Sequence, residues 1–193
     1  SSSLAPQEEL DPRKYWIDHV YPFFYYSSID GFWFSGHYDV ASPMSIRERP
    51  EPTFARAALD VGASTQGSYA IILDGQAPAY WEGWRFGLTL SLTRSNRMGY
   101  YGQGNDAPFD KDSTAGRSHF YQVSRVNGGA RATVQRRIVG PLRALVGGTL
   151  EKTDYRELPG GSVFAKDRAS GVIGDDEDPF SDAVARVGLV LDS

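Results

Sequence analysis

One segment near the middle of the chain alternates strictly between apolar and polar residues. In WRFGLTLSLTR, residues 84–94, every second side chain from Trp84 to Leu92 is apolar and those between are polar, charged or glycine. Successive side chains of a β-strand point to opposite faces of a sheet, so the segment predicts a strand with one apolar and one polar face. The nine residues from Trp84 to Leu92, at about 3.3 Å each, can cross the hydrocarbon core of a bilayer when tilted.

The same alternation recurs along the chain and predicts an all-β protein. The expected strands are residues 21–27, 32–40, 54–64, 68–77, 84–94, 120–136, 141–155 and 183–193. Short segments such as SIDG at 28–31 predict hairpin turns, whereas residues 95–119 and 156–182 are long polar connections. We expect no helix, because no segment has a convincing helical period. Residues 1–20, which are polar, are expected to form a periplasmic linker or tail ahead of the strands in 21–193.

Composition narrows the function classes. The 193 residues include 4 Trp, 11 Tyr and 10 Phe, an aromatic content that argues against a disordered chain. The sequence has no run of eighteen apolar residues, which excludes a transmembrane helix. The absence of cysteine excludes disulfides, thiolate metal sites and cysteine catalysis. A net charge of −4 gives no electrostatic reason to expect a nucleic acid partner.

Three features favour an antiparallel transmembrane β-barrel over a soluble β-sandwich or a lipocalin-like barrel. The polar faces of the strands carry arginines, namely Arg85, Arg131, Arg143 and Arg186. The apolar faces mix Gly and Ala with Leu and Val, which suits a lipid-facing surface better than a tightly packed core. Aromatic residues also gather at the ends of the predicted strands, as in the interfacial girdles of membrane barrels.

Several short motifs, taken in order, resemble the BamA/TamA-like bacterial surface-antigen barrels. YSSIDG at 26–31 resembles the first hairpin of that superfamily, and APAYWEG at 77–83 resembles a short periplasmic turn. YYGQGND at 100–106 looks like a loop motif that follows the fifth strand, and VLDS at 190–193 resembles the end of the eighth. The loop-motif residues are Tyr101, Gly102, Gly104, Asn105 and Asp106.

The resemblance implies a sixteen-stranded barrel in the outer membrane of a Gram-negative bacterium, of which this chain is the N-terminal half. The implied function is insertion or translocation of proteins at that membrane. The implied partners are outer-membrane lipids, the remaining barrel half or a second copy, and client outer-membrane proteins. The first strand, with Tyr21, Phe23 and Tyr25, would be the seam that templates an incoming strand.

No residue pattern predicts a catalytic site, a cofactor or a metal centre, so we expect a protein that is not an enzyme. The three histidines, His19, His37 and His119, lack metal-ligand spacing, and we place them in the linker, on the second strand and in a long loop. The acidic run at 175–178 lacks the spacing of an EF-hand and is interpreted as a solvated loop.

The four arginines are the best candidates for a functional role on the polar face. They could favour anions in a pore or dock an internal loop. We favour a structural role, in which they form ion pairs inside the lumen with Glu151, Asp60 and Asp192.

Three other functions stay open on the sequence. The barrel could anchor a fused periplasmic enzyme, or it could be a self-contained eight-stranded porin-like or adhesion barrel. The chain could also be a soluble β-sandwich that acts as a binding module.

Overall fold

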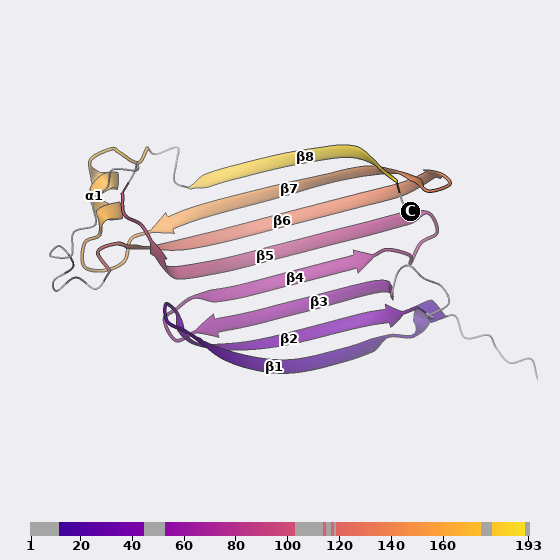
Figure 1. Cartoon of the computed structure of the whole chain (residues 1–193), viewed down its shortest axis with the longest axis horizontal. Helices are drawn as coiled ribbons and strands as arrows, with labels where there is room; N and C mark the ends of the chain where they lie inside the picture. The colour runs from indigo at the N-terminus through magenta and orange to yellow at the C-terminus, as the bar shows by residue number, and fades with distance from the viewer. Residues whose placement is uncertain are drawn as a thin grey trace, which may run out of the picture.

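Eight antiparallel strands form one continuous sheet in the order β1 to β8, each paired with its neighbour in the sequence (Figure 1). The structure, a computed structural model, describes residues 12–44, 53–102, 114, 117, 119–174 and 179–191. The strands are β1 (Ile17–Ser27), β2 (Gly31–Pro43), β3 (Thr53–Ser64), β4 (Tyr69–Ala77), β5 (Trp84–Gly99), β6 (Gln122–Val139), β7 (Leu142–Arg156) and β8 (Phe180–Leu191). The predicted all-β class and the number of strands are confirmed.

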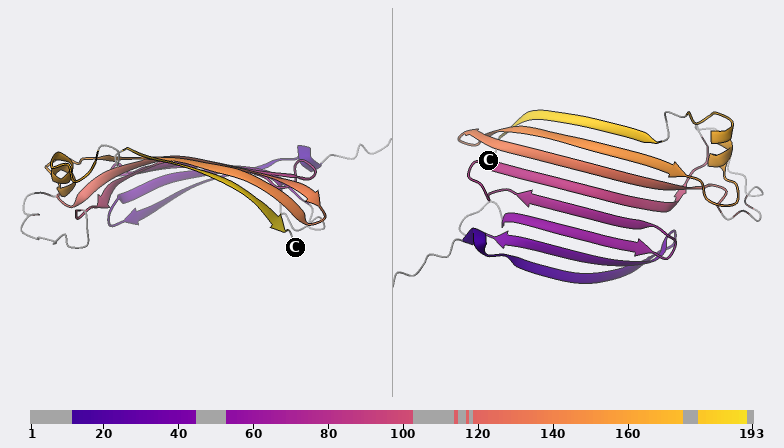
Figure 2. Two further views of the ribbon diagram at one scale, coloured as in Figure 1. Left: turned by 90° about the horizontal axis from the view of Figure 1, so that it is seen from above. Right: turned by 180° about the vertical axis from the view of Figure 1, so that it is seen from behind.

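The sheet is open. β1 and β8 lie at its two edges and do not pair with each other, so these eight strands are not closed into a barrel. Figure 2 shows that the sheet is twisted and curved instead of flat. The antiparallel meander agrees with the sequence-based prediction, whereas a complete barrel is not formed by the described residues.

Two strand boundaries differ from the sequence-based prediction by four residues or more. β1 begins at Ile17, four residues earlier than expected, because residues 17–20 continue the pairing with β2 from Ile17 opposite Ala41 to Val20 opposite Tyr38. His19 therefore lies on β1 and not in a linker. β5 continues to Gly99 across a bulge in its pairing with β6. Polar residues in these extensions hid them from a search for alternation.

The second correction is a helix inside the connection between β7 and β8. α1 (Val163–Ala169) follows Ser162, whose hydroxyl accepts a hydrogen bond from the backbone N–H of Ala165 at 3.1 Å. This side-chain bond satisfies one of the free N–H groups that every helix start exposes. With only 7 residues, α1 is too short to show a helical period in the sequence. A 3-10 turn, η1 (Pro12–Lys14), precedes β1.

The molecule has little hydrophobic core. Among the described residues, the buried apolar side chains are Phe54, Ala55, Ala58, Phe120, Val123 and Phe164. The accessible surface of the whole chain is 13440 Å², whereas a folded monomer of 21.3 kDa exposes roughly 9,100 Å². Across the described ranges, no helix is long and apolar enough to cross a membrane.

Candidate functional site: the two faces of the sheet

One face of the sheet is apolar and exposed on every strand. The register places one uncharged residue from each strand in a continuous row: Val20, Tyr38, Leu59, Leu73, Leu90, Ala130, Leu150 and Ala183. Large side chains on this face are far from buried, with Phe34 and Leu150 each 63% exposed and Val187 84% exposed. We call this surface the apolar belt. Soluble monomeric proteins rarely expose a contiguous apolar surface that extends across a whole sheet.

Charged residues bound the apolar belt along the strands. On β6, Arg136 stands at one limit, opposite Trp84. On β7, Lys152 stands at the other limit, opposite Gly128 of β6. The eight residue-to-residue steps from Arg136 to Gly128 span about 26 Å along the strand at ~3.3 Å each. At the strand tilt of membrane barrels this corresponds to a height of about 20 Å, close to the ~25 Å apolar band of such barrels.

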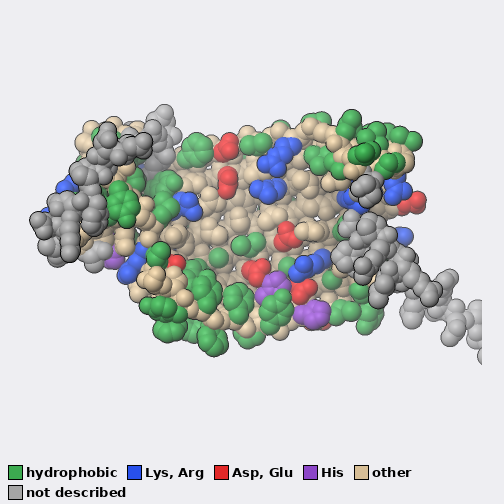
Figure 3. Space-filling view, in the orientation of Figure 1, with side chains coloured by type: hydrophobic (Ala, Val, Ile, Leu, Met, Phe, Trp, Pro, Cys, Tyr) green, Lys and Arg blue, Asp and Glu red, His purple; other side chains and the backbone are tan. Residues whose placement is uncertain are grey.

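The opposite face is polar and is the one seen in Figure 3, where acidic and basic side chains lie over both the lower and the upper strands. Side chains here are more covered than those of the apolar belt. The side chains of His37 and Asp39 are only 12% and 13% exposed. We call this surface the polar face. Its charges must be satisfied by one another or by bound water, because burial removes their solvation.

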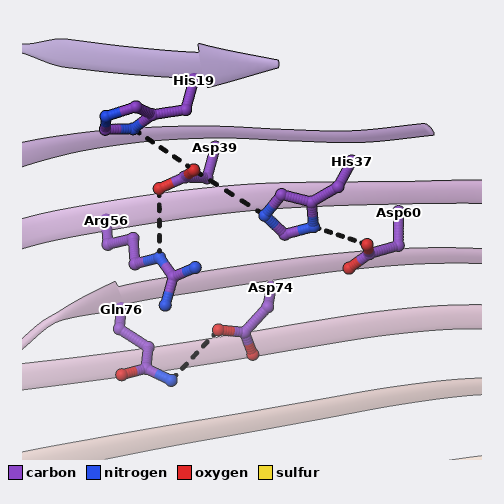
Figure 4. A network of polar contacts seen from close by, with 7 residues as sticks. All are labelled: His19, His37, Asp39, Arg56, Asp60, Asp74 and Gln76. Carbon is purple, nitrogen blue, oxygen red and sulfur yellow. Dashed lines mark hydrogen bonds and ion pairs between the residues drawn. The ribbon is translucent and has the colours of Figure 1, made fainter. Parts of the chain in front are cut away.

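A network of polar contacts crosses β1, β2 and β3 on the polar face (Figure 4). His37 Nδ1 lies 2.5 Å from Asp60 Oδ1, and its Nε2 lies 3.8 Å from Asp39 Oδ1. Asp39 also contacts Arg56 Nε at 3.6 Å and His19 Nδ1 at 3.5 Å. The contacts join side chains of three strands, with His19 of the edge strand β1 at the exposed margin of the network.

Sequence reasoning missed this network. It placed His37 on the second strand but gave the histidine no partner. The signal was present in the alternation, since His37 and Asp39 share one face and Asp60 lies on the polar face of the next hairpin strand. The position of His37 opposite Asp60 belongs to the β2–β3 register, which a search for metal-ligand spacing does not test. In the described part of the chain, no group of three or more His, Cys, Asp or Glu could hold a metal ion.

The three predicted seam residues all project onto the polar face from β1. The Tyr21 ring stacks on His37 with ring centroids 4.7 Å apart, and Tyr25 stacks on Trp33 at 5.9 Å. Phe23 lies between them, opposite Ser35. Among the described residues, no strand pairs with the outer edge of β1. The side chains of Tyr21 and Tyr25 pack against β2.

All four predicted arginines lie on the polar face. Arg131 pairs across the ladder with Thr89 and Thr149, and Arg186 lies opposite Gly147. Arg143 is buried, with 5% of the residue exposed. Arg85 and Arg131 line a hollow of about 350 Å³ in the polar face.

The ion pairs that we predicted for these arginines with Glu151 and Asp60 do not form among the described residues. Asp60 contacts His37 instead. Glu151 lies opposite Gly129, one row away from Arg131 in the register. Asp192 lies outside the described residues.

The predicted loop motif is only partly described. Tyr101 stacks on Tyr121 with centroids 5.3 Å apart, and Gly102 has a positive φ of 111° that favours glycine. Gly104, Asn105 and Asp106 lie outside the described residues, as does the acidic run at 175–178. His119 Nδ1 lies 2.9 Å from Gln122 Oε1 at the start of β6.

Comparison of the chain with protein-family models, with curated proteins and with solved structures found no match. The resemblance to the BamA/TamA-like barrels thus stays a prediction from short motifs, and we infer function from the two faces of the sheet.

Proposed function

We propose that this chain forms part of the wall of an outer-membrane β-barrel of the BamA/TamA-like kind, with a non-enzymatic role in insertion or translocation of proteins at the outer membrane of a Gram-negative bacterium. The observation that carries the proposal is the apolar belt, an uncharged row through all eight strands whose large side chains are exposed. Lipid is the partner that such a surface fits best.

A soluble sheet of this kind would bury its apolar face under a second layer. The described residues provide no such layer over the apolar belt, since all eight strands belong to one sheet and α1 lies at one end of it, against the ends of β6 and β7. The height of the belt, about 20 Å at barrel tilt, also suits a bilayer. These points favour a membrane wall over a soluble binding module.

The open edges supply the second part of the proposal. Hydrocarbon cannot satisfy the unpaired N–H and C=O groups of β1 and β8, so both edges need further strands. The remaining barrel half or a second copy would provide them. The proposed role in protein insertion uses the edge of β1, whose backbone would template a strand of a client protein, with Tyr21, Phe23 and Tyr25 beside it.

The connections suggest an orientation. The end of the sheet that carries α1 also carries the long connections after β5 and β7, and we call it the α1 end. The opposite end, where β1 begins and β8 ends, has the two-residue turn after β6 and is called the terminal end. Long loops of outer-membrane barrels are extracellular and short turns periplasmic, so we propose that the α1 end faces outward.

A matched pair of substitutions on β5 tests the membrane assignment. Leu90 lies in the apolar belt, and its neighbour Ser91 lies on the polar face. Leu90→Arg would place a charge in hydrocarbon at a cost of about 2–4 kcal/mol, whereas Ser91→Arg would not. With an export signal in a Gram-negative host, we expect Leu90→Arg to lower the amount of urea-resistant protein in the outer membrane severalfold. Equal recovery of both variants, or recovery of the unsubstituted chain without detergent, would disprove the assignment.

Crosslinking tests the templating role. The chain has no cysteine, so a single Tyr25→Cys on β1 can be compared with Ile72→Cys on the interior strand β4. With the protein in vesicles and an unfolded barrel client that carries one cysteine, Tyr25→Cys should give disulfide-linked client and Ile72→Cys should not. If the vesicles accelerate client folding while both positions crosslink equally, the proposed use of the β1 edge is wrong.

A further inference from the structure

An arginine and a tryptophan form a pair at the limit of the apolar belt on the terminal end. Arg136 of β6 and Trp84 of β5 are directly opposite in the ladder. The guanidinium carbon of Arg136 lies 5.0 Å from the centroid of the Trp84 ring system, within the range of a cation–π contact. Trp84 in turn stacks on Phe86 at 5.9 Å with an interplanar angle of 14°. This stack holds the arginine at the last row of the belt.

More aromatic rings extend this pair. Trp81 packs edge-on against Phe86 at 5.2 Å, and Tyr80 packs edge-on against Trp81 at 4.9 Å. Trp16, just before β1, lies 6.3 Å from Tyr80. Trp81 stays 53% exposed. We call Arg136 with Trp84, Phe86, Trp81 and Tyr80 the Arg136 platform.

The position of the platform determines which layer of a bilayer it would contact. Amphipathic aromatic rings concentrate at the boundary between hydrocarbon and headgroups. Arg136 projects from the apolar face, one row beyond the uncharged rows, whereas its neighbour Arg137 lies opposite Arg143 on the polar face. In the described part of the chain no carboxylate forms an ion pair with Arg136; the ion pairs found there involve other residues. A cation held there faces the headgroup layer.

The chemistry of the guanidinium selects the ligand. A contact with the ring uses no N–H···O hydrogen bond of the guanidinium, and its N–H donors fit phosphate oxygens in pairs. Carboxylates from the protein do not occupy them among the described residues. Phosphate is the anion that a headgroup layer presents to such a donor.

We infer that the Arg136 platform is a binding site for the phosphate of a phospholipid headgroup, in the leaflet at the terminal end of the sheet. This inference rests on the proposed membrane location and adds to it a lipid class and a boundary of the bilayer. Arg136 provides the charge, Trp84 orients it, and the surrounding rings occupy the interface.

The test uses quenching of tryptophan fluorescence by phospholipids that carry bromine in the acyl chain. The full chain is placed in vesicles of brominated phosphatidylglycerol, whose phosphate has no cation in its own headgroup, or of brominated phosphatidylcholine, whose phosphate is neutralised by the trimethylammonium of the same headgroup. Mixed with unlabelled lipid, the two series give the relative affinity for each headgroup. One basic residue near an anionic surface contributes about 1 kcal/mol, so we expect about a fivefold preference for phosphatidylglycerol.

Three variants give the matched comparison. Arg136→Gln should lose most of the preference, and Arg136→Lys should keep part of it because it retains the charge but not the paired donors. Arg137→Gln removes the same charge one residue away on the other face and should leave the preference intact. If Arg136→Gln keeps the full preference, or Arg137→Gln loses as much, the platform is not the site.

Failure of the inference can be told apart from failure of the proposed function. Quenching by both lipids with no effect of Arg136→Gln would overturn the phosphate site alone. No quenching by either lipid in the unsubstituted chain would show that no tryptophan meets hydrocarbon, and it would overturn both proposals. Heat-modified migration on gels checks that each variant has folded.

Discussion

The α1 end and the apolar belt differ in how far their apolar side chains are covered by the rest of the protein. At the α1 end, Phe164 and Val123 are 3% and 0% exposed, as in the core of a soluble protein. Phe164 packs edge-on against Tyr100 at 5.4 Å and lies 6.1 Å from Tyr155, and the backbone N–H of Val163 donates to the carbonyl of Phe120 at 2.9 Å. In the belt, residues of the same type stand exposed on every strand.

The difference shows which parts of the chain can supply their own stability. The α1 end is covered by its own side chains, so its packing needs no partner. Strand pairing holds the sheet together at the belt, but most of the apolar area there gains nothing until lipid or another protein covers it. The two regions should therefore respond differently to substitution and to removal of detergent.

The largest effect that would sharpen this comparison is expected from Phe164→Ala. Removing a buried aromatic side chain costs about 3–5 kcal/mol, which is more than a small local unit can lose. We expect amide hydrogen exchange in 163–169 to approach that of an unprotected segment, while β4 in the belt keeps its protection. The measurement is exchange followed by mass spectrometry, in detergent.

Phe164→Leu provides the control, since it keeps most of the apolar volume and should lose much less protection. A loss of protection in β4 as large as that in α1 would show that the two regions unfold as one unit, and the comparison would break.

Sequence patterns predicted the belt well because successive side chains of a strand point to opposite faces. A strand with one apolar face therefore shows period-two alternation in its sequence. All eight strands were expected, and Trp84, Leu90 and Arg131 lie on the faces that alternation assigns to them. The position of Arg136 beside Trp84 also follows from alternation once the β5–β6 register is known.

The α1 end and the polar network could not be predicted in the same way. α1 depends on the Ser162 cap and on tertiary contacts of Phe164, neither of which leaves a period in 7 residues. The contact of His37 with Asp60 depends on the register between two strands. A register error of one residue would place the two side chains on opposite faces of the sheet. The pairing that we expected for Asp60, with an arginine, was wrong for this reason.

A smaller effect is expected in the polar network. His37→Ala would leave Asp60 and Asp39 without the ring that lies between them, and we expect a loss of about 1–2 kcal/mol in the free energy of unfolding. The exposure of Asp60, 42% of its side chain, keeps the effect in this range. His19→Ala is the matched control, because that side chain is 60% exposed and its contact with Asp39 is longer, at 3.5 Å.

Urea unfolding in detergent measures both variants, and a cycle with Asp60→Asn isolates the pair. Coupling between His37 and Asp60 of about 1 kcal/mol is expected. An equal loss for His19→Ala and His37→Ala would indicate that the network is not centred on His37.

The smallest effect concerns the bond that ties α1 to β5. The Tyr100 hydroxyl donates to Asp167 Oδ2 at 2.9 Å, from the residue after β5 to the interior of α1. Tyr100→Phe keeps the ring against Phe164 and removes the hydroxyl that makes this bond, so we expect protection of 163–169 to fall by about 0.5–1.5 kcal/mol. If the bond is the cause, Tyr100→Phe should have no further effect in an Asp167→Ala background. A decrease as large as that of Phe164→Ala would mean that the hydroxyl, and not the buried aromatic packing, holds α1 in place. The contrast between a self-packed end and an exposed belt would then lose its basis.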